Sequence, residues 1–517
     1  MDWGTRQVWR ANWAARWRVG GLGWISAQAL LLVFLGIFWS WGSGCRPERI
    51  SEDPNDRLDF SADTLLFDTV FTTIGSVTLP LKIFNRNDEA IHVESISLRE
   101  GAHSQFRMNV DGIPGYRVED LTLSSGDSLW IFVEVTVDPN TGLLPFVIED
   151  AIEVKRGQVV QEVILNAWGQ NAYFHGGLDP IETLPCPAVW SADKPHVIYG
   201  IVEVDKDCSL RILAGTQVHV HSGGGLLINQ GTLDVEGVLG SEVVFQGDRL
   251  EPEYDDVPGQ WGVELNFSYE TEYGIDAVTV ARGGIWLYGS KNSNIDYAII
   301  KNGTIGIQVD TVGVSNGYAL RLTNTRIFNM SAIGLYAQGG VIQGFNNLIY
   351  DCGQSAAAFT LGGVYRLDHC TFANYWSEGV REAPTVFFND WYEDINGTTQ
   401  IRPLDGSQFR NCIVWGNNAG LPDFDELAAD LLSPPVGGIF FNSAVDADDG
   451  TFPPSLLINC SDGLQPPFAS VLERDFHLVS NGTAWDGGSS NFPISRDLDG
   501  LPRAVGQPDK GCFERQQ

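Results

Sequence analysis

The residues best suited to chemistry in this 517-residue chain are carboxylates and aromatic rings. Asp255 and Asp256 stand together in an acidic, proline-containing segment, EPEYDDVPGQW. Neighbouring carboxylates can bind calcium, or serve as the acid and base of glycoside hydrolysis. We therefore treat both residues as candidate ligand contacts, beside the simpler interpretation of a solvated structural loop. No catalytic residue is assigned.

A second candidate is the stretch from 375 to 408, YWSEGVREAPTVFFNDWYEDINGTTQIRPLDGSQ. It contains Trp376, Arg381, Trp391 and Tyr392. Aromatic rings beside charged and amide side chains suit sugar binding, because rings stack on sugars while polar groups direct hydrogen bonds. The alternative is that these rings only cover the end or side of a repeat structure.

Metal ligands are sparse in the sequence. His219 and His221 are two apart in an expected strand, so they share one face, which we expect to be the solvated outer face. The segment DADDGT (446–451) has part of a calcium loop, so calcium is the one cofactor that the sequence suggests. Because no Cys or His cluster has zinc spacing, we predict no metal site.

The N-terminus has the features of a targeting sequence. Four arginines precede an uncharged stretch from Val19 to Gly44. A basic region, an apolar region and small residues predict a secretory signal over 1–44. The run GSGC resembles the lipobox of bacterial lipoproteins, which implies a lipidated Cys45 and a polar tether over 45–58. The alternative is an uncleaved transmembrane anchor. We expect an exported protein held by outer-membrane lipid, at the cell surface or otherwise facing the periplasm.

Charge and cysteine content narrow the function classes. With 65 acidic and 32 basic residues the net charge is −33, which argues against binding nucleic acid through phosphates. Polyuronates would be repelled for the same reason. Disulfides form in oxidising compartments, and Cys186 and Cys208, on either side of a strand-like segment, are the best candidate pair.

The elements that must position these residues are strands. Residues 59–171 alternate between apolar and polar residues in short runs separated by turn residues, which predicts an immunoglobulin-like β-sandwich. The order FDTVFTTIGS, LKIFNRND, DSLWIFVEVTVDP is similar to ASPM/SPD-2/Hydin-like modules of exported bacterial proteins. Such modules mostly bind or space.

From about Cys208 onward the sequence changes to short apolar strands separated by Gly and Asn. The segments AIIKN (298–302), TRIFN (325–329), NLIYD (347–351), CTFAN (370–374) and CIVWG (412–416) share one frame. Their spacing predicts a parallel β-helix, which we place over 172–480, and residues 208–480 would form roughly twelve coils. We expect insertions at 375–408 and 417–454, the second with a short helix in DFDELAADLL, and a C-terminal cap over 481–517.

Four stretches carry a wider resemblance: VVFQGDRLEPEYDDVPGQWGVE, IDYAIIKNGTIGIQVD, YRLDHCTFANYW and RDLDGLPRAVGQPDKGCFE. They resemble uncharacterised Bacteroidota lipoproteins with a right-handed parallel β-helix. The resemblance implies an all-β fold, with the sandwich followed by the β-helix, and a membrane-tethered location. It implies no activity, because that class has none settled.

The sequence favours a non-catalytic scaffold or binding module that engages a protein partner in an outer-membrane complex, such as one with a barrel, or a glycan. The alternative is a polysaccharide-active enzyme, a lyase or glycoside hydrolase of pectate-lyase-like fold. An enzyme requires carboxylates that converge with Arg or Lys in a groove. A glycan binder requires exposed rings in a row without such convergence.

Overall fold

The structure is a computed structural model. It describes residues 49–72, 75–138, 146–271, 274–310, 317–394, 396–418, 424–447, 450–461, 467–479, 482, 484–504 and 507–515. Apart from three short 3-10 turns, the regular structure in these ranges is β. None of the helical turns in these ranges has the length and apolar character needed to cross a membrane. The expected signal over 1–44 and Cys45 lie outside the described residues.

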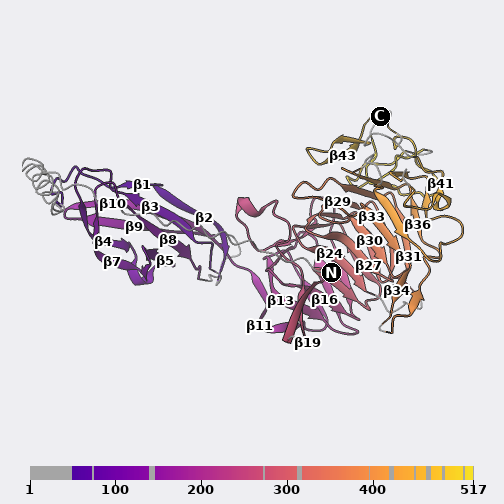
Figure 1. Ribbon diagram of the computed structural model, residues 1–517, viewed down its shortest axis with the longest axis horizontal. Coiled ribbons are helices and arrows are strands. Elements are labelled where there is room, and N and C mark those ends of the chain that lie inside the picture. Colours follow the sequence, from indigo (N-terminus) through magenta and orange to yellow (C-terminus); the bar gives the residue numbers. More distant parts are fainter. Residues whose placement is uncertain are drawn as a thin grey trace, which may run out of the picture.

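The N-terminal part is a β-sandwich of two five-stranded sheets (Figure 1). One sheet has the order β1 (Asp59–Phe60), β3 (Leu79–Phe84), β8 (Ser128–Val135), β5 (Phe106–Val110), β6 (Ile113–Gly115). The other has the order β2 (Thr64–Phe71), β10 (Val159–Gln170), β9 (Phe146–Arg156), β4 (Ile91–Leu98), β7 (Arg117–Leu123). Alternate residues of both sheets fill one apolar core, which is why these strands show a two-residue period.

The larger part is a parallel β-helix formed by a 17-stranded sheet and a 10-stranded sheet. The pairing from coil to coil divides the first into two series, called sheets A and B here, and the second is called sheet C. Sheet A contains β15 (Gln217–Val220), β18 (Val243–Gly247), β23 (Ala298–Lys301), β26 (Arg326–Met330), β29 (Leu348–Cys352), β32 (Thr371–Asn374), β37 (Ile413–Gly416) and β40 (Ala444–Val445). Sheet B contains β16 (Gly225–Asn229), β21 (Ile285–Tyr288), β24 (Ile305–Asp310), β27 (Ile333–Gln338), β30 (Ala357–Thr360), β33 (Val386–Asn389) and β38 (Leu427–Asp430). The strand β13 (His196–Val204), preceded by β11 (Tyr173–Thr183), pairs with both β15 and β16 and so begins sheets A and B.

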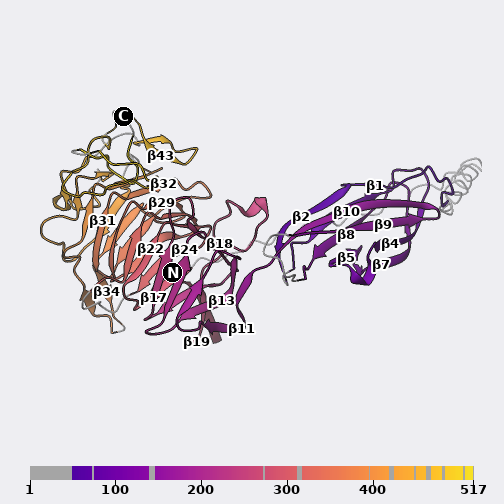
Figure 2. The same cartoon turned by 180° about the vertical axis from the view of Figure 1, so that it is seen from behind.

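Sheet C closes each coil and is seen from behind in Figure 2. It contains β12 (Ala188–Trp190), β14 (Ser209–Leu213), β17 (Thr232–Glu236), β22 (Ser293–Asp296), β25 (Leu320–Thr323), β28 (Val341–Phe345), β31 (Val364–Asp368), β36 (Gln408–Arg410), β39 (Phe440–Phe441) and β41 (Leu457–Ile458). Its ten strands correspond to ten coils within the described residues, fewer than the roughly twelve expected. The difference arises because insertions consume chain, among them the hairpin β19 (Glu264–Thr271) and β20 (Gly274–Ala281).

The predicted stacking frame is confirmed. Ile299, Arg326, Leu348, Thr371 and Ile413 pair in succession on neighbouring rungs of sheet A. The next residue of each segment points inward and is at most 1% exposed: Ile300, Ile327, Ile349, Phe372 and Val414. These columns cannot be buried by one coil alone, so stacking stabilises the coils together.

The corner between sheets C and A is built from left-handed residues. Seven residues there have φ between 47° and 54°: Tyr297, Asn324, Asn346, His369, Asn411, Asn442 and Asn459. Asn is the common choice because it tolerates this conformation and can bond to neighbouring polar groups. The Asn346 amide donates to Asn324 Oδ1 at 3.1 Å, and the Asn324 amide donates to Asp296 at 2.8 Å.

Two sequence expectations about insertions need correction. The segment DFDELAADLL is not a helix, because Leu427 pairs with Val386 and its strand β38 continues sheet B. Within 375–408, strand β33 also stays in sheet B. Only the residues around it leave the coil, including the hairpin β34 (Trp391–Glu393) and β35 (Thr399–Ile401).

The described residues within 467–515 pack along the outer face of sheet A, near β29 in Figures 1 and 2. Their hairpin, β42 (Phe468–Ser470) and β43 (Asp475–Leu478), places Phe476 against Tyr350 with ring centroids 5.0 Å apart. Trp415 is 2% exposed under the same cover. This segment therefore covers a side of the β-helix.

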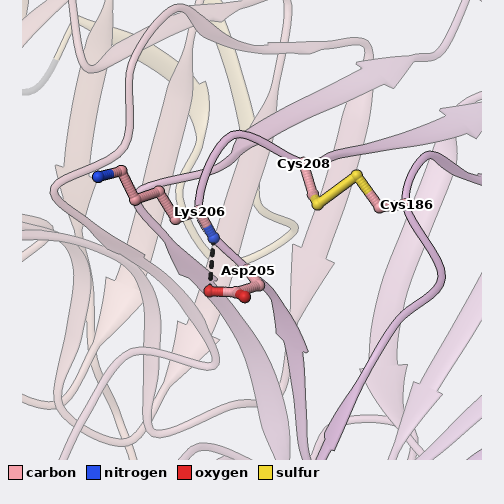
Figure 3. Close-up of a disulfide and its surroundings, with 4 residues drawn as sticks. All are labelled: Cys186, Asp205, Lys206 and Cys208. Carbon is pink, nitrogen blue, oxygen red and sulfur yellow. Dashed lines mark hydrogen bonds between the residues drawn. A yellow bond between two sulfur atoms is a disulfide. The ribbon is translucent and has the colours of Figure 1, made fainter.

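A disulfide ties the first coils together. Cys186 and Cys208, the pair expected from the sequence, are bonded with their Cα atoms 5.2 Å apart (Figure 3). The bond joins the residues before β12 to those before β14, which are neighbouring strands of sheet C.

Candidate functional site

The outer face of sheet B carries two rows of side chains that the register aligns. The first row follows the pairing from rung to rung: Glu203, Leu227, Trp286, Gln308, Tyr336, Ala358, Phe387 and Ala428. The second row contains hydrogen-bonding groups: Asn229, Tyr288, Asp310, Gln338 and Thr360, continued by Asn389 and Asp430. Side chains alternate along a strand, so both rows face outward while the residues between them fill the core.

The rings of the first row are accessible. Trp286, Tyr336 and Phe387 are partly exposed, and Tyr288 in the second row is 44% exposed. The side chain between Trp286 and Tyr336 is Gln308, which is fully buried. Apolar rings that stand in a line beside polar groups form a surface that can contact a long ligand. Figure 1 shows four strands of this sheet, β24, β27, β30 and β33, side by side.

A hydrogen-bond network fixes the centre of this face. Asp310 accepts from the Trp286 indole at 2.8 Å and from the Gln308 amide at 2.9 Å. Gln308 in turn accepts from the Gly283 backbone N–H at 2.8 Å. The Arg282 guanidinium lies 5.8 Å from the centre of the Trp286 ring. These contacts hold the indole in one orientation before any ligand arrives.

The Tyr336 hydroxyl stays protonated on this face. Burial raises its pKa, and the charge of Asp310 acts in the same direction. Thr360 and Gln338 bond to this hydroxyl and oppose the shift. Tyr336 can therefore donate a hydrogen bond to a ligand, while a phenolate base is disfavoured.

The described carboxylates of this face do not converge. Asp310 and Asp430 are four rungs apart in the second row, which is about 19 Å. Asp310 and Glu203 are three rungs apart, about 14 Å by the same spacing. Glycoside hydrolases place their two carboxyl groups roughly 5 to 10 Å apart. The described residues of sheet B therefore form a row of rings without a hydrolytic pair.

Asp255 and Asp256 lie at the corner between sheets A and B. Their backbone carbonyls accept from the amides of Asn302 and Asn329, both at 2.8 Å. The Asp256 side chain is 75% exposed, and Arg474 approaches it at 3.4 Å. The contacts of this loop are structural, and they leave its carboxylates apart from the rows on sheet B.

Arg381, which the sequence analysis gave as a candidate ligand contact, is buried and is not accessible to a ligand. Its guanidinium donates to Glu426 at 2.6 Å, and the two side chains are 1% and 0% exposed. It also donates to the Ala383 carbonyl at 2.6 Å and to the Asn417 side chain at 2.8 Å. Arg381 therefore joins the turns of two successive coils.

The predicted aromatic platform is divided between two corners. Trp376 lies between sheets A and B, where its carbonyl accepts from the Asn417 amide at 2.9 Å. Trp391 and Tyr392 stand in the hairpin between sheets B and C. The Arg402 guanidinium lies 5.1 Å from the Tyr392 ring centre. These rings border sheet B on opposite sides and do not form one surface.

The histidine pair differs from expectation. His219 does face outward, but it is 4% exposed because the Phe71 ring covers it at 4.9 Å. Burial lowers the pKa of His219 to about 4. His221 contacts Asp248 at 2.6 Å. Within the ranges that the structure describes, no group of three or more His, Cys, Asp or Glu side chains could hold a metal ion. Asp448 and Asp449 of the DADDGT segment lie outside those ranges.

Comparisons with known proteins give distant likenesses. No family model and no curated protein matches the chain. The catalytic unit of a GH87 α-1,3-glucanase from Streptomyces thermodiastaticus has 12% identity and a TM-score of 0.26, over 71% of this chain and 72% of that one. Pectate lyase Pel9A has 12% identity and a TM-score of 0.28, over 68% and 79%. The ASH/PapD-like domain of human CEP192 has 11% identity and a TM-score of 0.17, over 25% and 94%.

Both solved β-helix structures are polysaccharide-active enzymes, the class of the alternative prediction rather than of the non-catalytic one. Scores this low assign this chain no activity. The strand pairing itself defines the class of fold, an all-β chain with a sandwich followed by a parallel β-helix.

Sequence analysis missed Trp286, Tyr336 and Phe387. Each follows a buried residue in a short strand, so it occupies an outward position of the repeat. Aligning the outward positions of the coils is the signal that could have found them. Insertions of different length separate them in the chain, so only the strand register brings the three into one row.

Proposed function

We propose that this protein binds a polysaccharide along the outer face of sheet B. The observation that carries the proposal is the row of partly exposed rings at Trp286, Tyr336 and Phe387 beside a row of hydrogen-bonding side chains. Rings stack on the apolar faces of sugars, and amides, hydroxyls and carboxylates bond to sugar hydroxyls. A face several rungs long suits a chain of sugars better than a single one.

Binding without cleavage is the form of this proposal that the face supports best. It has no described pair of carboxylates at hydrolytic distance, as given above. One place favours the alternative, a polysaccharide-active enzyme. There Tyr336 supplies a protonated hydroxyl, Asp310 a carboxylate and Arg282 a cation, and the charges of Asp310 and Arg282 both act on Tyr336. Such a set could serve a lyase. Both forms share the same class of ligand.

The location belongs to the same proposal. Lipidation of Cys45 would anchor the protein in the outer membrane, and the sandwich, as an immunoglobulin-like spacer, would hold the β-helix away from the lipid. In this arrangement the protein presents polysaccharide to an outer-membrane partner. The net charge of −33 supports a body that stands off an anionic surface.

The test is a binding assay of the purified full chain against a panel of soluble and insoluble polysaccharides. Trp286→Ala should weaken binding at least tenfold, because stacking on a held ring is lost. Trp130→Ala is the matched control, since this ring is 43% exposed on the sandwich and should leave binding unchanged. Absence of binding to the whole panel, or equal binding by Trp286→Ala, would overturn the proposal.

The same samples separate binding from catalysis. Chain length and new chain ends are measured after prolonged incubation with the bound polysaccharide. An unchanged polymer supports the non-catalytic form. Shortened products that disappear with Tyr336→Phe, a variant that keeps the ring, establish the enzymatic form in its place.

A further inference from the structure

The rings on sheet B recur with a regular period. Trp286, Tyr336 and Phe387 occupy every second rung of the first row. Two rung spacings are about 10 Å. The intervening positions, Gln308 and Ala358, are 0% and 5% exposed, so they present little surface of their own. The face therefore offers a ring once every two rungs.

This period matches a sugar chain of a particular shape. Two rungs correspond to the length of two sugar units in an extended chain. In an extended chain with twofold symmetry, each sugar is turned over relative to the next, so the same face returns at every second unit. The three rings can then stack on the first, third and fifth sugars. A coiled chain turns its sugars away from a straight row and would lose contact with at least one ring.

The charges on the face disfavour an anionic ligand. The described outward residues of sheet B include Glu203, Asp310 and Asp430 but no Lys or Arg. The nearby cation, Arg282, already lies against Trp286. Carboxylate groups on a ligand would meet like charge along this row, whereas hydroxyls can bond to the amides and carboxylates.

From this geometry we infer that the ligand is an extended, neutral polysaccharide with a twofold, β-1,4-type repeat. The inference rests on the proposed function and specifies its ligand class. Five sugars reach all three rings, so sheet B acts as three stacking subsites separated by two sites that make polar contacts.

The test is calorimetric titration of the full chain with oligosaccharides of two to six units. The β-1,4-linked gluco-, manno- and N-acetylglucosamine series represent the extended neutral class. The α-1,4-linked gluco-series represents coiled chains, and the α-1,4-galacturonate series represents charged ones. For one extended series, affinity should rise about fivefold to tenfold from two to three units and again from four to five. It should rise little from three to four and from five to six.

Variants assign each increase in affinity to one ring. Phe387→Ala should remove the step between four and five units while leaving the step between two and three. Ala428→Ser, on the next rung of the same row, is the control and should keep both steps. Tighter binding of the coiled or charged series, or a smooth rise with length, would overturn this inference while leaving polysaccharide binding intact. Failure of every series and of the polymer panel would overturn the proposed function itself.

Discussion

Sheets A and B are adjacent faces of the same coils, yet the outer surface of sheet A is covered by the chain and that of sheet B is partly exposed. On sheet A, Tyr350 and Trp415 are 9% and 2% exposed because residues 467–515 pack over them. On sheet B, the rings of Trp286 and Phe387 remain partly exposed. Both rows include aromatic side chains placed by the same register. Whether a ring stabilises the fold or awaits a ligand is therefore decided by what covers it.

The sharpest test of this comparison removes one phenylalanine ring from the contact over sheet A and one from sheet B. Phe476→Ala removes a ring of the covering hairpin that is 1% exposed against sheet A, and should lower the free energy of unfolding by about 3 to 5 kcal/mol. Phe387→Ala on sheet B should lower it by about 1 kcal/mol or less, because part of that ring already contacts water. Urea denaturation measures both. Equal losses would mean that the two faces do not differ as described.

Substitution at the corner between the two sheets should lower the stability of the fold by almost as much. Arg381→Met leaves the fully buried Glu426 carboxylate without its cation, which should cost about 3 to 5 kcal/mol. The double variant Arg381→Met/Glu426→Met should recover most of that loss, since no unpaired charge remains. Thermal unfolding of the wild type, both single variants and the double variant gives the coupling. Additive losses would contradict a buried pair.

Low pH should reduce the stability of the fold at the N-terminal end of sheet A. His219 lies under Phe71, and burial lowers its folded pKa to about 4, below the ordinary value of 6.5. The unfolded chain takes up a proton that the folded chain excludes, so stability is complete above pH 6.5 and falls as the pH drops to about 4. The loss from this group should be roughly 2 to 3 kcal/mol. His219→Gln, which can still donate to the Gly247 carbonyl, should flatten this part of the pH profile.

Alkali should weaken the C-terminal cover, with a smaller effect. His477 bonds to Asp499 at 2.9 Å and to Asp475 at 2.5 Å, and these contacts raise its pKa to about 9. Its contribution is complete below pH 6.5 and is lost as the pH rises through 9. Because the side chain is 51% exposed, solvent screening keeps the effect below about 1 kcal/mol. Comparison with His477→Gln between pH 7 and 10 measures it.

The architecture was predictable because the core repeats. Buried positions such as Ile300, Ile327 and Ile349 must be apolar on every coil, so the pattern is visible in the chain. The coil count was too high because insertions look like coils until their pairing is known. The helix expected near Leu427 was wrong because packing on sheet B outweighs local helix preference.

The site was harder to predict for the same reason. Outward residues are free to vary, so Trp286 and Tyr336 leave no repeated signal. The sequence drew attention instead to dense clusters, such as the stretch around Arg381 and Trp391. That stretch is dense because it spans two corners of a coil, and its charged group is buried with Glu426.

The cover of sheet A follows the coils in the chain, and this sets an order of events during folding. The coils can stack on one another before the cover docks on them. Until the cover docks, however, the β-helix exposes an apolar surface that includes Tyr350 and Trp415. Docking of the C-terminal segment over the folded coils is therefore the last step of folding. A chain that lacks this step would be the form most prone to aggregate.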